Sequence, residues 1–393
     1  MRDRNSTLIN AILSTVLSSI LLLSLAVNAE VQDQAVEKEV GKITTSGYGS
    51  AYFVKANKDI DASGVNPVGS NGIGDDWSLR PDLIFGFQTN YQIEDRASVV
   101  LQLKAEGNDD MDINAEWAYF RYELMPDLYV RVGRLRIPYY LYSESLDVGY
   151  TYPWVRPPIE LYLTEFSHHE GVDLQWNFLL NNWGNQLQFA YSSLDDDVVK
   201  VRDTFHLAWT GYSDYWTVRG SVQYTDKVTL LLAKNDLPTA GTDKFIYFNL
   251  GGSYDNGVWL VISEFGAYDV GDKLPVIGQS NFTFTVGRRF NQWMPYLSLA
   301  KGYSTKSQED NIERHAIPKQ FVKSTYAQQS VGLGLRYEVS DAVVIKSEIV
   351  HYSGFENGGN FRVTDDTGLL DPQLIDRLGG SINLMSFGFD FLF

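Results

Sequence analysis

The sequence predicts an all-β fold, namely a transmembrane antiparallel β-barrel of about sixteen strands, with eighteen as the alternative. Apolar and polar residues alternate along most of the chain, which is the pattern of strands with one apolar and one polar face. Short turns alternate with long loops between these strands, as in barrels that cross a membrane. The chain ends in MSFGFDFLF, whose four phenylalanines occupy every second position and so share one face of a strand.

The N-terminus has the features of an export signal. Arg2 and Arg4 precede a mostly apolar stretch at 11–27, which small residues follow up to Ala29. This order predicts a signal peptide at 1–29, cleaved between Ala29 and Glu30. A retained anchor helix is the alternative, but the apolar run is short and rich in serine, whereas a spanning helix needs roughly 20 apolar residues. We expect a polar periplasmic tail at 30–42 and the barrel at 43–393.

Composition narrows the classes of function. Aromatic residues make up 14% of the 393 residues, and there are 33 glycines, which suits strands that are apolar on one face. The formal net charge of −17 argues against a nucleic-acid partner. The chain has no cysteine, so it has neither a disulfide framework nor a cysteine-based metal site.

Sixteen segments carry the alternation. In the second of them Leu83, Phe85 and Phe87 share one face, while Asp82 and Gln88 share the other. The expected strands are 43–55, 80–93, 97–106, 113–124, 127–138, 169–180, 184–194, 203–211, 215–225, 243–254, 258–268, 280–290, 294–303, 328–338, 342–352 and 382–393. The long connections include 56–79, 139–168, 226–242, 304–327 and 353–381. An additional strand at 228–234 would raise the count toward eighteen.

The terminal phenylalanines indicate which face points outward. A row of rings on a free edge strand promotes aggregation in water, whereas a closed barrel in lipid pairs all its backbone groups internally. We therefore expect the apolar faces to contact lipid and the last strand to close against the first, 43–55. A secreted soluble β-protein is the alternative.

With these features the chain resembles the general porins of Gram-negative bacteria, the sixteen-stranded class, over essentially its whole mature length. The signal peptide, the alternation of turns and loops, the segment SGYGSAYF at 46–53 and the terminal Phe393 carry the resemblance. It implies a homotrimer in the cell outer membrane, in contact with lipid and lipopolysaccharide. It also implies recognition by the barrel-assembly machinery, for which Phe389, Phe391 and Phe393 would be the signal. The implied activity is passive diffusion of small hydrophilic solutes and ions through a water-filled channel, without catalysis or a cofactor.

The polar faces supply the candidate pore residues. Inward cations include Lys104, Arg219 and Lys346. In general porins the loop after the fifth strand folds into the barrel, and by strand count that loop is 139–168 here. The resemblance implies that acids of this loop face an arginine cluster across a constriction. The candidates are Arg80, Arg121, Arg131, Arg134, Arg136, Glu144, Asp147, Glu160 and Glu165. Neutralised ion pairs along a wet wall, or an ordinary external loop, are the alternatives.

Other functions stay open at this point. His168 and His169 suggest a metal site, but neighbouring strand residues point to opposite faces, so we expect no bound metal. A channel specific for an anion or a sugar is one alternative, and a non-conducting receptor or adhesin is another. A barrel enzyme would need a nucleophile beside one of the five histidines, and the sequence pairs none of them with one.

Overall fold

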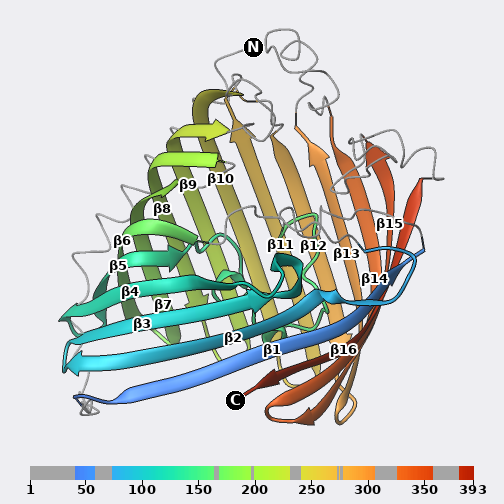
Figure 1. The fold of residues 1–393 in the computed structure, drawn as a ribbon, viewed down its shortest axis with the longest axis horizontal. Helices are drawn as coiled ribbons and strands as arrows, with labels where there is room; N and C mark the ends of the chain where they lie inside the picture. The colour runs from blue at the N-terminus through green and yellow to red at the C-terminus, as the bar shows by residue number, and fades with distance from the viewer. Residues whose placement is uncertain are drawn as a thin grey trace. The chain divides into compact units, whose positions relative to one another are not determined.

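The computed structural model describes residues 40–57, 73–162, 168–195, 199–230, 240–271, 274, 278–305, 325–356 and 380–393. Within Val40–Phe393, sixteen antiparallel strands form one closed barrel (Figure 1). The expected signal peptide, with Ala29 and Glu30 at its cleavage site, lies outside the described residues. In the part of the chain that the structure describes, no helix is long and apolar enough to span a membrane.

Each strand pairs with its neighbours in sequence, and the first pairs with the last. The strands are β1 (Ile43–Ala56), β2 (Ser78–Glu94), β3 (Ala97–Glu106), β4 (Ile113–Met125), β5 (Leu128–Arg136), β6 (His168–Leu180), β7 (Trp183–Asp195), β8 (Val199–Tyr212), β9 (Trp216–Leu230), β10 (Ala240–Asp255), β11 (Trp259–Val270), β12 (Gln279–Arg288), β13 (Trp293–Ser304), β14 (Ala327–Ser340), β15 (Val343–Glu356) and β16 (Ser381–Leu392). The prediction of a sixteen-stranded barrel is confirmed. Of the additional strand expected at 228–234, residues 228–230 continue β9, and 231–234 lie outside the described residues.

Two kinds of connection define the two ends of the barrel. At one end, which we call the short-turn end, β2–β3, β4–β5 and β6–β7 are joined by 95–96, 126–127 and 181–182. Asp127 and Asn181 adopt φ of 63° and 54° there. Asn, Asp and Gly tolerate this left-handed conformation best, which is why they recur in these turns. At the opposite end, the long-loop end, β5 and β6 are separated by 137–167.

The alternation in the sequence becomes an apolar outer wall and a largely polar inner wall. Outward side chains such as Phe87, Phe189 and Leu333 are exposed, whereas inward ones such as Gln102 and Thr285 are buried. A soluble protein would bury its large apolar side chains instead. The outer surface is therefore suited to lipid.

The terminal phenylalanines complete the seam between β1 and β16. The Gly47 amide donates to the Phe393 carbonyl oxygen at 2.9 Å, and the Phe393 amide donates to that of Gly47 at 3.0 Å. The Phe393 ring covers Gly47 so closely that a Cβ atom there would lie 2.0 Å from the ring carbon Cζ. The same ring stacks on Phe85, with centroids 5.7 Å apart. Glycine in β1 thus makes room for the last ring of the chain.

We expect Gly47→Ala to weaken this seam, because its methyl group would displace the Phe393 ring. Overpacking of this kind destabilises by about 1–3 kcal/mol. A folded barrel and an unfolded chain migrate differently on a denaturing gel. The measurement is the temperature at which heating before electrophoresis converts the folded band into the unfolded one. Gly220→Ala is the matched control, since the nearest atom to its Cβ would be 3.9 Å away. Equal transition temperatures for the two variants would contradict the proposed packing.

Candidate functional site

Residues 137–162, which we call the inner segment, follow β5 and lie against the inner wall of the barrel (Figure 1). Ser221 of β9 donates to the Tyr139 carbonyl oxygen at 2.7 Å. The Trp154 indole nitrogen donates to Thr285 of β12 at 2.9 Å. The segment contains two short 3-10 turns, η2 (Ser143–Ser145) and η3 (Gly149–Thr151). It therefore contacts strands that are far from β5 around the barrel.

Aromatic and aliphatic side chains pack the inner segment against three sectors of the wall. Each sector forms a cluster of buried side chains, with one side from the segment and the other from strands and, in one cluster, from Ile73 of the β1–β2 connection. The clusters are Ile159 with Val54, Ala56, Ile73, Tyr352, Ile382 and Leu384; Ile137, Tyr139, Tyr140, Leu161 and Tyr162 with Tyr247; and Tyr152 and Trp154 with Leu260, Ile262, Met294 and Tyr296. Close packing of this kind excludes water. The lumen along β10, β11, β13, β15, β16 and β1 is thus partly filled by a dry core.

Lys346 fixes turn η3 of the inner segment to the wall. Its side chain is fully buried, and Nζ donates to the carbonyl oxygens of Gly149 at 2.6 Å and Trp154 at 2.7 Å. Asp390 of β16 lies 2.8 Å from the same nitrogen and also accepts from the hydroxyls of Ser50 and Tyr52. An ammonium group has three N–H donors, so all three are used. Such full satisfaction is what makes a buried ion pair tolerable.

Two further groups hold the segment from other sides. Arg336 of β14 donates to the carbonyl oxygens of Tyr150 at 2.7 Å and Tyr152 at 3.2 Å. Arg156, within the segment, pairs with Asp82 of β2. Backbone carbonyls without strand partners are thereby satisfied inside the barrel, as buried polar groups require.

A cluster of five charges ties the segment to β3, β4 and β5. Lys104 lies 2.6 Å from Glu106, 2.8 Å from Glu116 and 3.2 Å from Asp147, and Arg136 pairs with the last two carboxylates. Three anions meet two cations, so the cluster has a formal charge of −1. Glu116 occupies a register shift between β3 and β4, which places it inward in spite of the alternation. Sequence periodicity therefore did not single it out.

Two buried glutamates anchor the closing part of the segment. Glu160 is 1% exposed and accepts a hydrogen bond from Gln328 of β14 at 2.8 Å. Burial raises the pKa of this carboxyl group, since desolvation disfavours its charged form. Glu264 of β11 accepts from the Leu141 amide at 2.8 Å and from the Tyr162 hydroxyl.

The structure brings only some of the predicted pore residues together. Arg136 and Asp147 belong to the five-charge cluster, and Glu144 is exposed on the inner segment. Arg131 pairs with Asp173 on the inner wall, with a nitrogen–oxygen distance of 2.8 Å. Arg121 lies over the ring of Tyr129, 3.7 Å from its centroid.

Three other residues predicted to line the pore do not lie at the inner segment in the described structure. Arg134 pairs with Glu170 on the outer face that carries Val132, because it lies three positions after the inward Arg131 and a period of two reverses its side. The expectation that Arg134 lines the lumen is therefore wrong. Arg80 is at the long-loop end, where it pairs with Asp110 and is 43% exposed. Glu165 lies outside the described residues.

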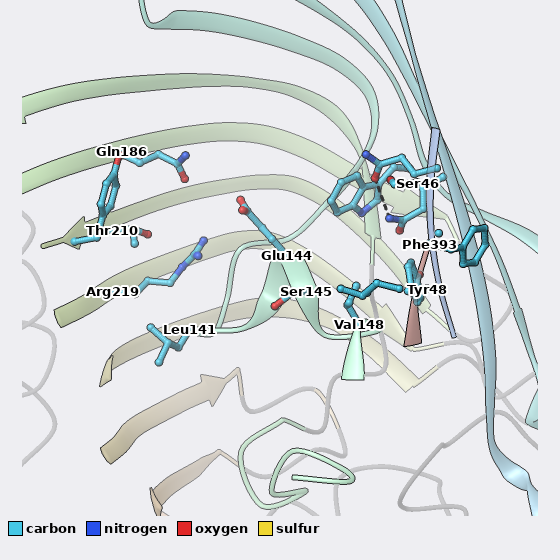
Figure 2. Close-up of a pocket in the computed structure, with 16 residues that line it drawn as sticks. Ser46, Tyr48, Leu141, Glu144, Ser145, Val148, Gln186, Thr210, Arg219 and Phe393 are labelled. Atoms are coloured by element: carbon cyan, nitrogen blue, oxygen red, sulfur yellow. Dashed lines mark hydrogen bonds between the residues drawn. The ribbon is translucent and has the colours of Figure 1, made fainter. Parts of the chain in front are cut away.

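A cavity of about 670 Å³ remains between the inner segment and the opposite wall (Figure 2). It is lined by Ser46, Gly47, Tyr48, Gln88, Gln102, Trp117, Leu141, Glu144, Ser145, Val148, Gln186, Thr210, Tyr212, Arg219, Leu392 and Phe393. Figure 2 shows Glu144 extending from the segment toward the side that carries Gln186, Thr210 and Arg219. Arg219 is 4% exposed, and its Nε and Nη2 have no hydrogen-bond partner among the described residues. Its inward position follows from the alternation, but nothing in the sequence marks it for this site.

Among the described residues, no group of three or more potential metal ligands is found. His169 instead lies 2.7 Å from the Ser192 hydroxyl through Nδ1. Both side chains are less than 5% exposed.

We expect Lys346→Met to destabilise the barrel by about 3–5 kcal/mol, because it leaves the buried Asp390 carboxylate unpaired. The double variant Lys346→Met with Asp390→Leu should recover much of this loss, since it removes both charges. Thermal unfolding in detergent measures both. Lys227→Met, which removes an exposed pair with Asp203, is the control and should leave the transition unchanged. A wild-type transition for Lys346→Met would contradict the assigned role.

Comparison with known proteins identifies the fold. No family model and no curated protein matches the chain. Among solved structures, the anion-selective porin from Comamonas acidovorans has a TM-score of 0.56 at 12% identity, covering 90% of this chain and 100% of that one. OmpF of Salmonella typhi, solved with daunomycin, has a TM-score of 0.56 at 10% identity, with coverages of 90% and 98%. The trimer form of OmpT, an outer membrane protein of Vibrio cholerae, has 0.55 at 9%, with coverages of 90% and 100%. The chain therefore has the fold of a porin-like outer-membrane β-barrel.

Proposed function

We propose that this protein is a channel in the cell outer membrane of a Gram-negative bacterium, through which small hydrophilic solutes and ions diffuse passively. The observation that carries the proposal is the cavity of about 670 Å³, lined by polar and apolar side chains, inside a closed barrel whose outer wall is apolar. A closed barrel satisfies its backbone within lipid, and a wide barrel leaves room for an aqueous path. The porin-like fold supports the same function.

The inner segment, within the loop that we predicted at 139–168, is the element that sets the width of this path. It fills the sector in front of β10, β11 and β13 with buried rings, so solutes would pass beside it along β1–β4 and β7–β9. Glu144 and Arg219 project into this path from opposite sides. Charges in a low-dielectric wall interact strongly with a passing solute. Size and charge together would decide which solutes cross.

The extent of this filling favours a second candidate, a channel selective for one class of solute. Three dry clusters occupy the lumen, whereas a general pore needs an open aqueous cross-section. A narrow path brings each solute into contact with wall side chains, and such contact is the basis of selectivity.

The remaining features of this proposal concern export and assembly. We propose a cleaved signal peptide at 1–29, a periplasmic tail at 30–42 and a homotrimer in contact with lipid and lipopolysaccharide. The trimer form of a structurally similar barrel supports the oligomeric state. The seam that Phe393 closes supports its role, with Phe389 and Phe391, as a signal for the barrel-assembly machinery. Burial of His169 and Ser192 speaks against their use as a catalytic pair, and no cofactor is proposed.

Conductance of the refolded mature chain in a planar lipid bilayer tests the channel. Steps in multiples of three are expected from an open trimer. Deleting 143–160 should raise the single-channel conductance, because it removes most of the inner segment. Altered mobility on a denaturing gel shows that the shortened barrel is folded. A folded wild-type barrel that never conducts would contradict the channel and favour a receptor or adhesin.

Reversal potentials in a salt gradient test the two charges in the cavity. We expect Glu144→Gln to shift the preference toward anions and Arg219→Gln to shift it toward cations, since each removes one sign of charge from the path. Glu170→Gln, on the outer face, is the control and should not change the potential. Identical reversal potentials in all four proteins would exclude the cavity as the permeation path.

A further inference from the structure

The cavity has two rows of inward side chains that the strand register places side by side. Ser46 opposes Gln88, Gln88 opposes Gln102, and Gln102 opposes Trp117 across β1 to β4. On the other wall Gln186 opposes Thr210, and Thr210 opposes Arg219 across β7 to β9. All seven line the same cavity. Directly opposed residues on one face lie about 4.5–5.5 Å apart between Cβ atoms, so each row is a continuous strip.

The rows offer hydrogen bonds of both kinds. A glutamine amide carries two donors and an acceptor, and a hydroxyl carries one donor and two acceptor lone pairs. Gln102 donates to Gln88 at 3.0 Å, and both side chains line the cavity, so this bond uses only part of the hydrogen-bonding capacity of the pair. A simple ion uses only donors or only acceptors. A solute rich in hydroxyl groups uses both, and it matches a wall of amides and hydroxyls.

Aromatic rings share the cavity with the two rows. Tyr48, Trp117 and Tyr212 line it, and Tyr48 is 5% exposed, so its ring is built into the wall. Sugars present apolar C–H groups beside their hydroxyl groups, and these rings would cover the C–H faces of such a solute.

Charge balance points to a neutral solute. Glu144 and Arg219 are the charged residues of the cavity, and they have opposite signs. A monovalent ion would be attracted by one and repelled by the other. The volume of about 670 Å³ lies in the range of pockets that hold small organic molecules.

We propose that this cavity is a binding site for a neutral polyhydroxylated solute of saccharide type. The site rests on the proposed channel and names its solute class. The amide rows would bind the hydroxyl groups, and Glu144 and Arg219 would each take one more hydroxyl as acceptor and donor.

Two measurements with sucrose as the probe test the site. The first is saturable reduction of the single-channel current, and the second is titration calorimetry of the detergent-solubilised barrel. We expect saturable binding to the wild type and a loss of affinity of about tenfold in Gln102→Ala, the size of one lost hydrogen bond. Gln175→Ala is the control, because Gln175 does not line the cavity; it should bind sucrose like the wild type.

The outcomes separate the site from the channel. A conducting wild type with no saturable effect of sucrose and no heat of binding would overturn the saccharide site and leave the channel standing. Tighter binding of the zwitterion glycylglycine than of sucrose would also overturn it. Calorimetric binding that Gln102→Ala weakens, in a folded barrel that does not conduct, would support the site and overturn the channel.

Discussion

Every backbone N–H and C=O group that faces lipid must find its partner within the protein, because hydrocarbon offers none. The pairing of β1 with β16 meets this constraint by closing the sheet. Once the sheet is closed, each side chain points either to lipid or to the lumen. The residues at the seam show how strict this geometry is, since Gly47 has no side chain and the Phe393 ring takes its place.

Closing the sheet encloses a large interior. Sixteen strands enclose more space than their own inward side chains fill, and the inner segment occupies much of it. Its rings build the dry clusters, while buried cations such as Lys346 satisfy its backbone carbonyls. The ionic groups fix the position of the segment on the wall, and the apolar groups exclude water around them. The ion pairs depend on this packing, because water and salt would screen them if they were exposed.

The strands were predictable from sequence because a period of two is a local property, which any short window reveals. The same period fixed Arg131 and Arg219 as inward. The sequence-based predictions were wrong at positions where the resemblance to porins was used in place of the period of two, and incomplete where an irregularity in the strand interrupts that period. Arg134 was grouped with its neighbours although the period places it outward. Glu116 turns inward at a register shift, and the anchoring role of Lys346 depends on carbonyl groups that are about 190 residues away in sequence. No periodicity encodes such contacts.

Most residues that anchor the inner segment differ from those that line the cavity, and this has a consequence for selectivity. Lys346 and Arg336, which hold the inner segment from β15 and β14, are different residues from Gln102 and Arg219, which line the cavity; on β3 and β9 the anchors Lys104 and Ser221 lie two positions further along. Contacts that share no partners contribute to stability almost independently. The solute-facing rows can therefore change without loosening the segment that narrows the path. Gly47 and Phe393 are the exception, because they belong both to the seam and to the cavity. A partial separation of anchoring residues from solute-facing ones is a physical reason why barrels of this fold can share a scaffold at very low sequence identity.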